Sequence, residues 1–353
     1  MNNFKRVLII SPYYRLRKGG IASVIQLYKK NLARNFKYAP SIYFQNLYLS
    51  LLFFPINILI IGVILLLNRN LKILHIHGSH GGSFFRKLII FWIGKNLFKK
   101  KIVYHLHSSD FKEFYSEASN KTKEKIKYLL SNADLIIVLS EEWEDYIVNN
   151  FTTKQIRVLE NIVEKQKQID PIKRDDKTNL LFLGRIGERK GVFDLLECLN
   201  TMDSSNRKKI TLTIGGDGEV DRLQRKIKDY QLDNVYFEGW VKGKRKSELL
   251  INSDIFILPS YNEGLPISLL EAMSYGKPII STNVGGIPRI LKNERNGFII
   301  EPGNKKQLQK AIISYVNDKQ LAGTHGAEGL KMVEKYYPNS VLEKLNAIYS
   351  EIL

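Results

Sequence analysis

The sequence predicts an α/β protein made of two doubly wound domains, and three observations lead to this fold class. Short runs rich in Val and Ile alternate with longer helix-like segments, which is the βαβ rhythm of a parallel sheet covered by helices. A polar segment at residues 164–178, with Pro171 and no apolar periodicity, interrupts this rhythm once, as a linker does. The length of 353 residues is too great for one ordinary core and suits two domains of roughly 150–200 residues.

The first half of the chain carries five expected strands with helices between them. We expect strands at residues 6–10, 41–44, 73–76, 102–105 and 135–138, and helices at residues 20–34, 84–98 and 122–131. The most apolar segment, residues 47–67, is interrupted by Pro55, Asn57 and Gly62. Its longest unbroken apolar run is about half of the ~20 residues that span a bilayer. We therefore expect a buried or interfacial helix there rather than a transmembrane one.

The second half repeats the rhythm with six expected strands, at residues 179–183, 211–215, 235–237, 255–258, 278–281 and 297–300. We place the first domain at residues 1–165, the linker at 166–178 and the second domain at 179–327. Residues 328–353 are helical in character but follow the last strand of the second sheet. Ligands of doubly wound sheets bind at the carboxyl ends of the strands, so we expect the functional residues in the loops that follow them.

The formal charge of +19 is distributed unevenly. No acidic residue precedes Asp110, whereas 17 Lys and Arg residues do, and the rest of the chain is nearly neutral, with 37 basic and 35 acidic residues. A surface of one sign attracts anionic partners. Nucleic acid, anionic lipid and phosphorylated substrates all qualify, and charge alone does not choose among them.

The chain has a single cysteine, Cys198, which excludes an intramolecular disulfide framework. This cysteine usage suits a reducing, cytoplasmic compartment, and we expect no secretory signal in the first eleven residues. We expect Cys198 itself to be a small buried apolar residue.

The sharpest motif spans residues 262–272. Glu263 lies in a loop before a helix and Glu271 lies about two turns inside that helix, so both carboxylates can face one cleft,. Gly264, followed by Leu265, lets the backbone approach a ligand closely, and the first N–H groups of the helix can bind phosphate or hydroxyl oxygens. Two carboxylates at such an edge suit a ligand with many hydroxyl groups.

A second motif spans residues 183–191, directly after the first strand of the second half. Its glycines free the backbone, and Arg185 and Lys190 lie close enough in sequence to clamp one diphosphate. Arginine supplies a bidentate fork and lysine a compact charge. Where a diphosphate is a leaving group, negative charge builds on its departing oxygen, and fixed cations stabilise that transition state more than the ground state.

Two histidine pairs end successive strands of the first half. His75 and His77 form one pair, and His105 and His107 form the other. Alternation along a strand puts both members of a pair on one face. Neither a carboxylate nor a cysteine accompanies the first pair, so we expect no zinc, and His75 and His105 suit histidines of the core.

The motif at residues 262–272 resembles the Glu-x7-Glu motif of family 4 of the retaining glycosyltransferases, whose two-domain fold is called GT-B. The resemblance extends over nearly the whole chain. It implies that Glu263 meets the donor sugar and that Glu271 binds the ribose of the donor nucleotide. It also implies that Arg185 and Lys190 grip the donor pyrophosphate.

The same resemblance implies roles for residues of the first domain. His107 falls where the family has a Thr-x-His-Gly-x-Asp stretch with its histidine close to the donor sugar, although Ser108 stands here in place of the usual glycine. Gly19 and Gly20 fall where the family has a glycine loop that touches the donor phosphates and the acceptor.

For the second domain, the resemblance places the backbone of Trp240 and Val241 at the nucleotide base, with a simply packed Trp240 as the alternative. In the resembled fold, the two Rossmann-like domains face an interdomain cleft. The last helix, here residues 328–353, is expected to cross back and pack on the first domain.

The resemblance implies that a sugar passes, with retention, from a nucleotide diphosphate donor to a saccharide or lipid-linked acceptor, as in capsule or other cell-surface polysaccharide assembly. No Asp-x-Asp triplet is present, so we expect metal-independent transfer with no cofactor and no metal site. No base for the acceptor hydroxyl is evident, which fits proton transfer to the donor's own phosphate. The acid-free first domain mixes cationic and apolar segments, which predicts peripheral docking on the anionic cytoplasmic face of the membrane.

Three other functions are open at this stage. A nucleotide-sugar epimerase shares the architecture and would act on the donor alone. A nucleic-acid-binding protein is suggested by the charge, but no recognition motif supports it. A catalytically dead regulator is disfavoured because Glu263, Arg185 and Lys190 are all present.

Overall fold

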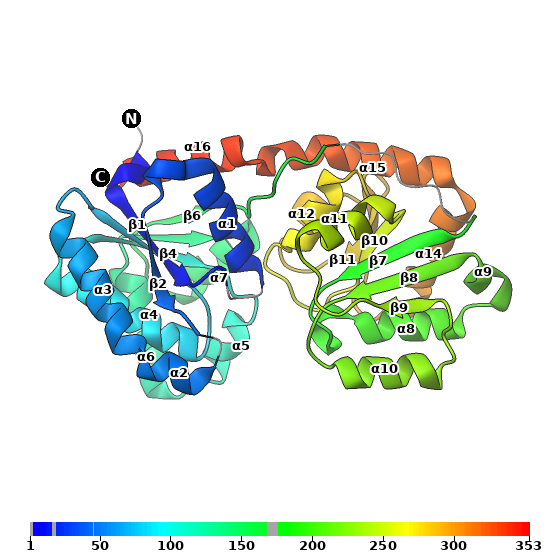
Figure 1. Ribbon diagram of the computed structural model, residues 1–353, viewed down its shortest axis with the longest axis horizontal. Coiled ribbons are helices and arrows are strands. Elements are labelled where there is room, and N and C mark those ends of the chain that lie inside the picture. Colours follow the sequence, from blue (N-terminus) through cyan, green and yellow to red (C-terminus); the bar gives the residue numbers. More distant parts are fainter. Residues whose placement is uncertain (1–2, 16–18, 45, 168–175) are drawn as a thin grey trace. The chain divides into compact units, whose positions relative to one another are not determined.

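The computed structural model of the protein describes residues 3–15, 19–44, 46–167 and 176–353 (Figure 1). The chain forms two compact units. Unit 1 comprises Met1–Ile162 together with Tyr336–Leu353, and unit 2 comprises Val163–Lys335. Each unit is a parallel six-stranded sheet with helices packed on it, which confirms the predicted fold class. Part of the expected linker, residues 168–175, lies outside the described residues.

The sheet of unit 1 has the strand order β2-β1-β3-β4-β5-β6, and all its pairings are parallel. Its strands are β1 (Val7–Pro12), β2 (Tyr38–Ile42), β3 (Ile73–Gly78), β4 (Lys101–Leu106), β5 (Leu135–Val138) and β6 (Ile156–Val158). The sixth strand was not predicted. It is a three-residue edge strand with the exposed Arg157 at its centre, so it carries no apolar run to mark it.

Helices cover both faces of this sheet. They are α1 (Gly20–Leu32), α2 (Leu47–Leu52), α3 (Phe54–Leu67), α4 (Gly82–Trp92), α5 (Phe111–Ser116), α6 (Asn120–Asn132), α7 (Glu141–Asn150) and α16 (Pro338–Ser350), with short turns at η1 (Asn3–Arg6), η2 (Ala33–Asn35) and the π-type η3 (Ile93–Leu97). Alternation along β3 sends Leu74 and Ile76 into a core with α3, α4 and α6,. His75 and His77 point to the opposite face, where α1 and α16 contribute Tyr28 and Tyr349.

The apolar segment at residues 47–67 forms two helices rather than one. The break falls at Phe53, and α3 begins at Phe54. Pro55 lies in the first turn of α3, where a proline is tolerated,. Among the described residues, no helix combines the length and the apolar character that crossing a bilayer requires.

Unit 2 has the strand order β12-β11-β10-β7-β8-β9, again entirely parallel. Its strands are β7 (Thr178–Leu183), β8 (Ile210–Gly215), β9 (Val235–Phe237), β10 (Ile255–Leu258), β11 (Ile279–Thr282) and β12 (Gly297–Ile300). Its helices are α8 (Val192–Thr201), α9 (Ser204–Lys208), α10 (Val220–Asp229), α11 (Gly243–Asn252), α12 (Ile267–Ser274), α13 (Ile287–Ile290), α14 (Lys305–Asn317) and α15 (Lys319–Val333), with turns at η4 (Glu188–Lys190) and η5 (Glu334–Tyr336). Cys198 is fully buried on α8, and burial raises the pKa of its thiol to about 12.

The final segment divides between the units. α15 belongs to unit 2, whereas α16 belongs to unit 1. The backbone N–H of Asn3 donates to Asn346 Oδ1 over 2.9 Å, and Asn3 Nδ2 donates to Ser350 Oγ over 2.7 Å. The last helix therefore closes over the first turn of the chain, beside α1 (Figure 1).

Candidate functional site

The two motif-bearing loops of unit 2 meet where its strand order reverses. β7 and β10 are neighbours in the sheet, although 71 residues separate the end of one from the start of the other. Loop 184–191 follows β7 and loop 259–266 follows β10. The carboxyl ends of strands at such a reversal are the usual ligand position in open α/β sheets.

Glu263 and Lys190 form an ion pair across these loops. The same carboxylate oxygen, Oε1, accepts a hydrogen bond from Ser260 Oγ at 2.8 Å. Glu263 is only 5% exposed and Lys190 only 15%. Burying either charge alone would be costly, so each fixes the position of the other. The structure thus joins two residues that the sequence had placed in separate motifs.

Hydrogen bonds to backbone carbonyl groups hold the two loops together. Arg189 Nη1 donates to the carbonyl oxygen of Asn262 over 3.0 Å, and the N–H of Tyr261 donates to the carbonyl oxygen of Arg189 over 2.8 Å. Gly191 has a φ of 68°, and a Cβ there would lie 2.0 Å from the carbonyl oxygen of Pro259. No other residue type fits this position without displacing one loop.

A third loop supports the Glu263 loop from behind. Gly285 has a φ of 54°, and a Cβ there would lie 1.9 Å from the carbonyl oxygen of Glu263. The N–H of Gly286 donates to the carbonyl oxygen of Gly264 over 2.6 Å. Sequence reasoning did not connect this loop to Glu263, and the Gly-Gly pair after β11 was the available signal.

Glu271 has a partner that the sequence did not suggest. It lies on α12, and its carboxylate accepts from Lys246 Nζ of α11 at 2.5 Å. The two side chains are 20% and 27% exposed, respectively. Leu265 and Gly264 are buried just before α12, so they can present backbone groups rather than side chains. Lys246 was missed because it sits in a basic run, residues 242–246, where no local pattern distinguishes it.

Arg185 lies beside a hollow of about 270 Å³. The hollow is lined by Arg185, Ile186, Gly187, Glu188, Arg189, Lys190, Gly218 and Glu219. Both carboxylates on this lining bind Arg222, with Glu219 Oε2 at 2.9 Å. Among the described residues Arg185 is exposed and has no ion-pair partner, so its guanidinium is free to bind an anion.

Trp240 and Val241 follow β9 at the same edge of the sheet. The side chain of Val241 packs close to Gly215 at the end of β8, and the N–H of Gly216 donates to the carbonyl oxygen of Gly239 over 2.7 Å. Trp240 is 38% exposed, so part of its ring remains accessible to a ligand.

In unit 1, His107, Gly19 and Gly20 follow strands of that unit's own sheet: His107 comes after β4, and the two glycines come after β1. His107 directly follows β4, and its Nε2 lies 2.7 Å from Nδ1 of His77 at the end of β3. Gly19 caps α1 with a φ of 113°, and Gly20 is the first residue of that helix. The preceding Arg17 and Lys18 lie outside the described residues.

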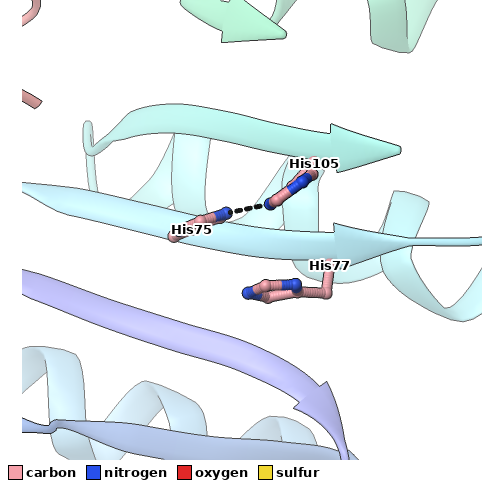
Figure 2. Close-up of side chains that lie close together, drawn as sticks. All are labelled: His75, His77 and His105. Carbon is pink, nitrogen blue, oxygen red and sulfur yellow. Dashed lines mark hydrogen bonds between the residues drawn. The ribbon is translucent and has the colours of Figure 1, made fainter. Parts of the chain in front are cut away.

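The histidines form a stacked cluster inside unit 1 (Figure 2). His75 Nε2 lies 3.3 Å from His105 Nδ1, and His75 Nδ1 lies 2.5 Å from the hydroxyl of Tyr349. The rings of His75 and His77 stack with their centroids 4.4 Å apart. One nitrogen from each of His75, His77 and His105 lies within 4.8 Å of the others. His75 Nε2 and His105 Nδ1 lie at hydrogen-bonding distance from each other, so one of these two nitrogens carries a proton and is not a metal ligand while this contact is made,.

Burial keeps these imidazoles neutral. It lowers the pKa of His75 and of His107 to about 3, and it holds the pKa of His77 and of His105 well below 6.5. Neighbouring imidazoles and the buried Lys87 add to the effect at His77 and His107. A neutral imidazole has one donor and one acceptor nitrogen, so His107 can orient a ligand by hydrogen bonding without carrying charge.

One further polar residue at this end of the sheet, His80, was not singled out from the sequence. His80 Nδ1 lies 2.5 Å from Ser108 Oγ, and its Nε2 lies 3.9 Å from Asp110 Oδ2. Ser108 stands where the resembled family has glycine, and its hydroxyl is used here to hold His80.

Known proteins resemble this chain in sequence and in fold. Residues 163–332 match the family described as "Glycosyl transferases group 1". An uncharacterized glycosyltransferase of Methanocaldococcus jannaschii is 27% identical to 72% of this chain, over 69% of its own length. The capsular polysaccharide biosynthesis glycosyltransferase CapM of Staphylococcus aureus is 27% identical over 62% of each chain. Among solved structures, Anabaena HepE in complex with UDP-glucose matches in fold with a TM-score of 0.78 at 17% identity, over 98% of this chain and 99% of that one.

Proposed function

We propose that this chain, whose residues 163–332 match the glycosyl transferases of group 1 and whose fold is GT-B, moves a sugar from a nucleotide diphosphate sugar to a saccharide or lipid-linked acceptor. We place this reaction in the assembly of a cell-surface polysaccharide, as the printed name of the CapM relative suggests. The observation that carries the proposal is the buried Lys190–Glu263 pair beside the exposed Arg185 at the reversal of the unit 2 sheet.

The cations of loop 184–191 suit the donor diphosphate. Within the part of the chain that the structure describes, the Arg185 guanidinium at the hollow has no ion-pair partner, and Lys190 retains ammonium protons beyond the one that binds Glu263,. Both would stabilise the charge that grows on the departing diphosphate. Because Lys190 also holds Glu263, binding of the diphosphate and placement of the Glu263 carboxylate at the transferred sugar would be coupled. We assign Glu263 to the transferred sugar.

The nucleoside end of the donor would lie toward Glu271 and Trp240. A carboxylate held by Lys246 is a good acceptor for the paired hydroxyls of a ribose. The backbone at Trp240 and Val241 would meet the base, and the backbone at Gly264 and Leu265 would meet the donor near the sugar.

Unit 1 would contribute groups that bind hydroxyls without adding charge. We assign His107, neutral and held by His77, to orient the transferred sugar. The amides at Gly19 and Gly20 would contact the donor phosphates and the acceptor.

We further propose retention of configuration without a metal. Arg185 and Lys190 would supply the positive charge that a metal would otherwise bring to the diphosphate. The donor's own phosphate would take the proton of the acceptor hydroxyl. Trapping a covalent sugar adduct on Glu263 would contradict this mechanism. We expect the protein to work on the cytoplasmic face of a membrane, attached peripherally.

The proposal is tested first by donor binding. Thermal shift across UDP-, GDP- and ADP-sugars should identify one nucleotide that stabilises the protein, because a ligand that binds only the folded state raises its stability. Transfer is then measured with that donor and saccharide acceptors. Conversion of the donor sugar without any acceptor would indicate an epimerase, and binding of nucleic acid in place of every nucleotide sugar would overturn the proposal.

A further inference from the structure

Unit 1 exposes an unusual amount of apolar side chain in one stretch of sequence. Of the twenty large apolar side chains that are exposed in the described residues, fourteen lie between Tyr48 and Leu97. They come from α2, α3, α4 and η3. Leu59, Leu66 and Leu67 of α3 are each at least 65% exposed. A patch of this kind on a folded protein marks an interaction surface.

Helix α3 explains why the patch exists. Asn57, Ile61 and Leu65, spaced four residues apart, form its buried stripe against the unit 1 core. The remaining faces are also apolar, whereas a surface helix of a globular protein normally turns polar residues to solvent. Some apolar medium must therefore cover the outer faces of α3.

Exposed apolar side chains also occur on α4 and η3, which follow α3 in the chain. The backbone of Gly62 in α3 comes close to the ring of Phe98, which follows η3, and Ile89 and Trp92 of α4 are about half exposed. Figure 1 shows α2, α3 and α4 grouped in unit 1. We call the exposed side chains of residues 48–97 the apolar face.

The positive charge of this part of the chain indicates that a lipid bilayer, rather than a second copy of the chain, covers the apolar face. No acidic residue occurs before Asp110. Arg69 and Lys99 are exposed just after α3 and η3, and Lys72 is exposed just before β3. Two copies meeting through this face would bring like charges together. Anionic headgroups would meet opposite charge, and Tyr48 and Trp92 are residue types that sit well at a headgroup boundary.

We propose that the apolar face docks on an anionic lipid bilayer, with α2 and α3 lying in the plane of the headgroup–acyl boundary. With 14 residues, α3 is about 21 Å long, less than the ~30 Å of a hydrocarbon core, so it lies in the interface rather than crossing it,. Basic side chains provide the attraction and apolar ones the insertion. The inference deepens the location given in the proposed function by naming its surface and partner.

Sedimentation with vesicles tests the docking. The full chain should bind vesicles of phosphatidylcholine mixed with phosphatidylglycerol much more strongly than phosphatidylcholine alone, and salt should weaken the binding. Replacing Leu59→Ser together with Leu66→Ser should lower vesicle affinity by on the order of tenfold or more. The control is Val148→Ser on α7, an apolar residue outside the face that is 55% exposed, which should bind like the wild type.

Fluorescence locates the contact. Lipids brominated in the acyl chain should quench Trp92, and the Trp92→Phe variant should lose that quenching. Equal binding to both vesicle types, no binding, or a Leu59→Ser/Leu66→Ser variant that binds like the wild type would overturn the proposal. A concentration-dependent dimer that this double variant abolishes would assign the face to a second copy instead. Transfer to a soluble saccharide should persist in the double variant, so failure of docking and failure of the proposed function are distinguishable.

Discussion

Unit 1 and unit 2 have the same architecture but treat charge in opposite ways. In each, one strand order reversal lies inside a parallel six-stranded sheet, between β1 and β3 in unit 1 and between β7 and β10 in unit 2. The reversal in unit 2 carries an ion pair and, within the described part of the chain, a guanidinium without an ion-pair partner. Beside the reversal in unit 1, β3 and β4 carry histidines, with His107 directly after β4, and burial keeps these imidazoles neutral. The same strand order thus carries charged side chains in one unit and neutral imidazoles in the other.

The surfaces of the two units also differ, in their exposed apolar side chains and in their acidic residues. Unit 1 shows the apolar face and no acidic residue before Asp110, whereas unit 2 mixes acidic and basic residues throughout its sequence. The comparison teaches that two sheets of the same topology differ in the side chains on their strands, in the loops after the strands and on the outer helix faces. Four experiments test this contrast between the two units.

The largest difference should appear in mild acid. Since the pKa of His75 and of His107 is lowered to about 3 in the folded state, the unfolded chain takes up protons below about pH 6.5 while the folded chain does not,. Stability is therefore complete above pH 6.5 and falls as the pH drops toward 3, by about 2 kcal/mol per ring at pH 5. Unit 2 has one histidine, His325, so unit 1 should open first, as measured by hydrogen exchange of peptides from each unit. Earlier opening of unit 2 would contradict the contrast.

The next effect should come from Lys190→Ala. It leaves Glu263 buried without its cation, which should cost about 3 kcal/mol in stability,. Transfer should fall by on the order of a hundredfold or more. Chemical denaturation and turnover measure the two effects.

A double variant separates these contributions. Lys190→Met with Glu263→Gln removes both charges, so it should regain most of the lost stability while transfer stays low. Recovery of activity along with stability would show that the pair is only structural.

A smaller effect, confined to activity, is expected for Arg185→Ala. The side chain is exposed and has no ion-pair partner among the described residues, so stability should hardly change. Turnover should fall by on the order of tenfold to a hundredfold because one diphosphate contact is lost. Arg225→Ala on α10 removes the same charge from an exposed position of unit 2 and should leave turnover unchanged.

The smallest effect should be that of Lys246→Ala. Without its ammonium group, Glu271 loses the contact that orients it, and KM for the donor should rise about tenfold with kcat little changed. Lys244→Ala is a matched control two residues away, since Lys244 is 92% exposed. Equal KM values for the two variants would show that the contact between Lys246 and Glu271 has no part in donor binding.

Most of the sheet framework was predictable because buried parallel strands are near-continuous apolar runs. Two deviations have clear causes. β2 begins at Tyr38, whereas the strand was expected to begin at residue 41, after Pro40. Proline disfavours the interior of a sheet, but β2 is an edge strand, where a proline is tolerated,. Residues 328–353 looked like one final segment, but α15 ends at Val333 and Pro338 starts a separate helix.

The site was predictable within each motif but not between motifs. Local sequence placed Glu263 and Lys190 in loops after strands, and only the strand order brought them together. The pairing of Lys246 with Glu271 joins two helices and has no local signature. For residues 47–67, composition predicted apolar helix, but whether its faces meet protein or solvent depends on how much of the helix the sheet covers.

The contact between Asn3 and α16 has a consequence for biosynthesis. Strands β1 to β6 leave the ribosome first, yet the helix that seals their histidine-bearing face is made after all of unit 2. Unit 2 can therefore complete its fold during translation, while unit 1 waits with one side of its sheet open. The part of the protein that is synthesised first is the last to mature, and it is the part most exposed to capture by chaperones or to premature association.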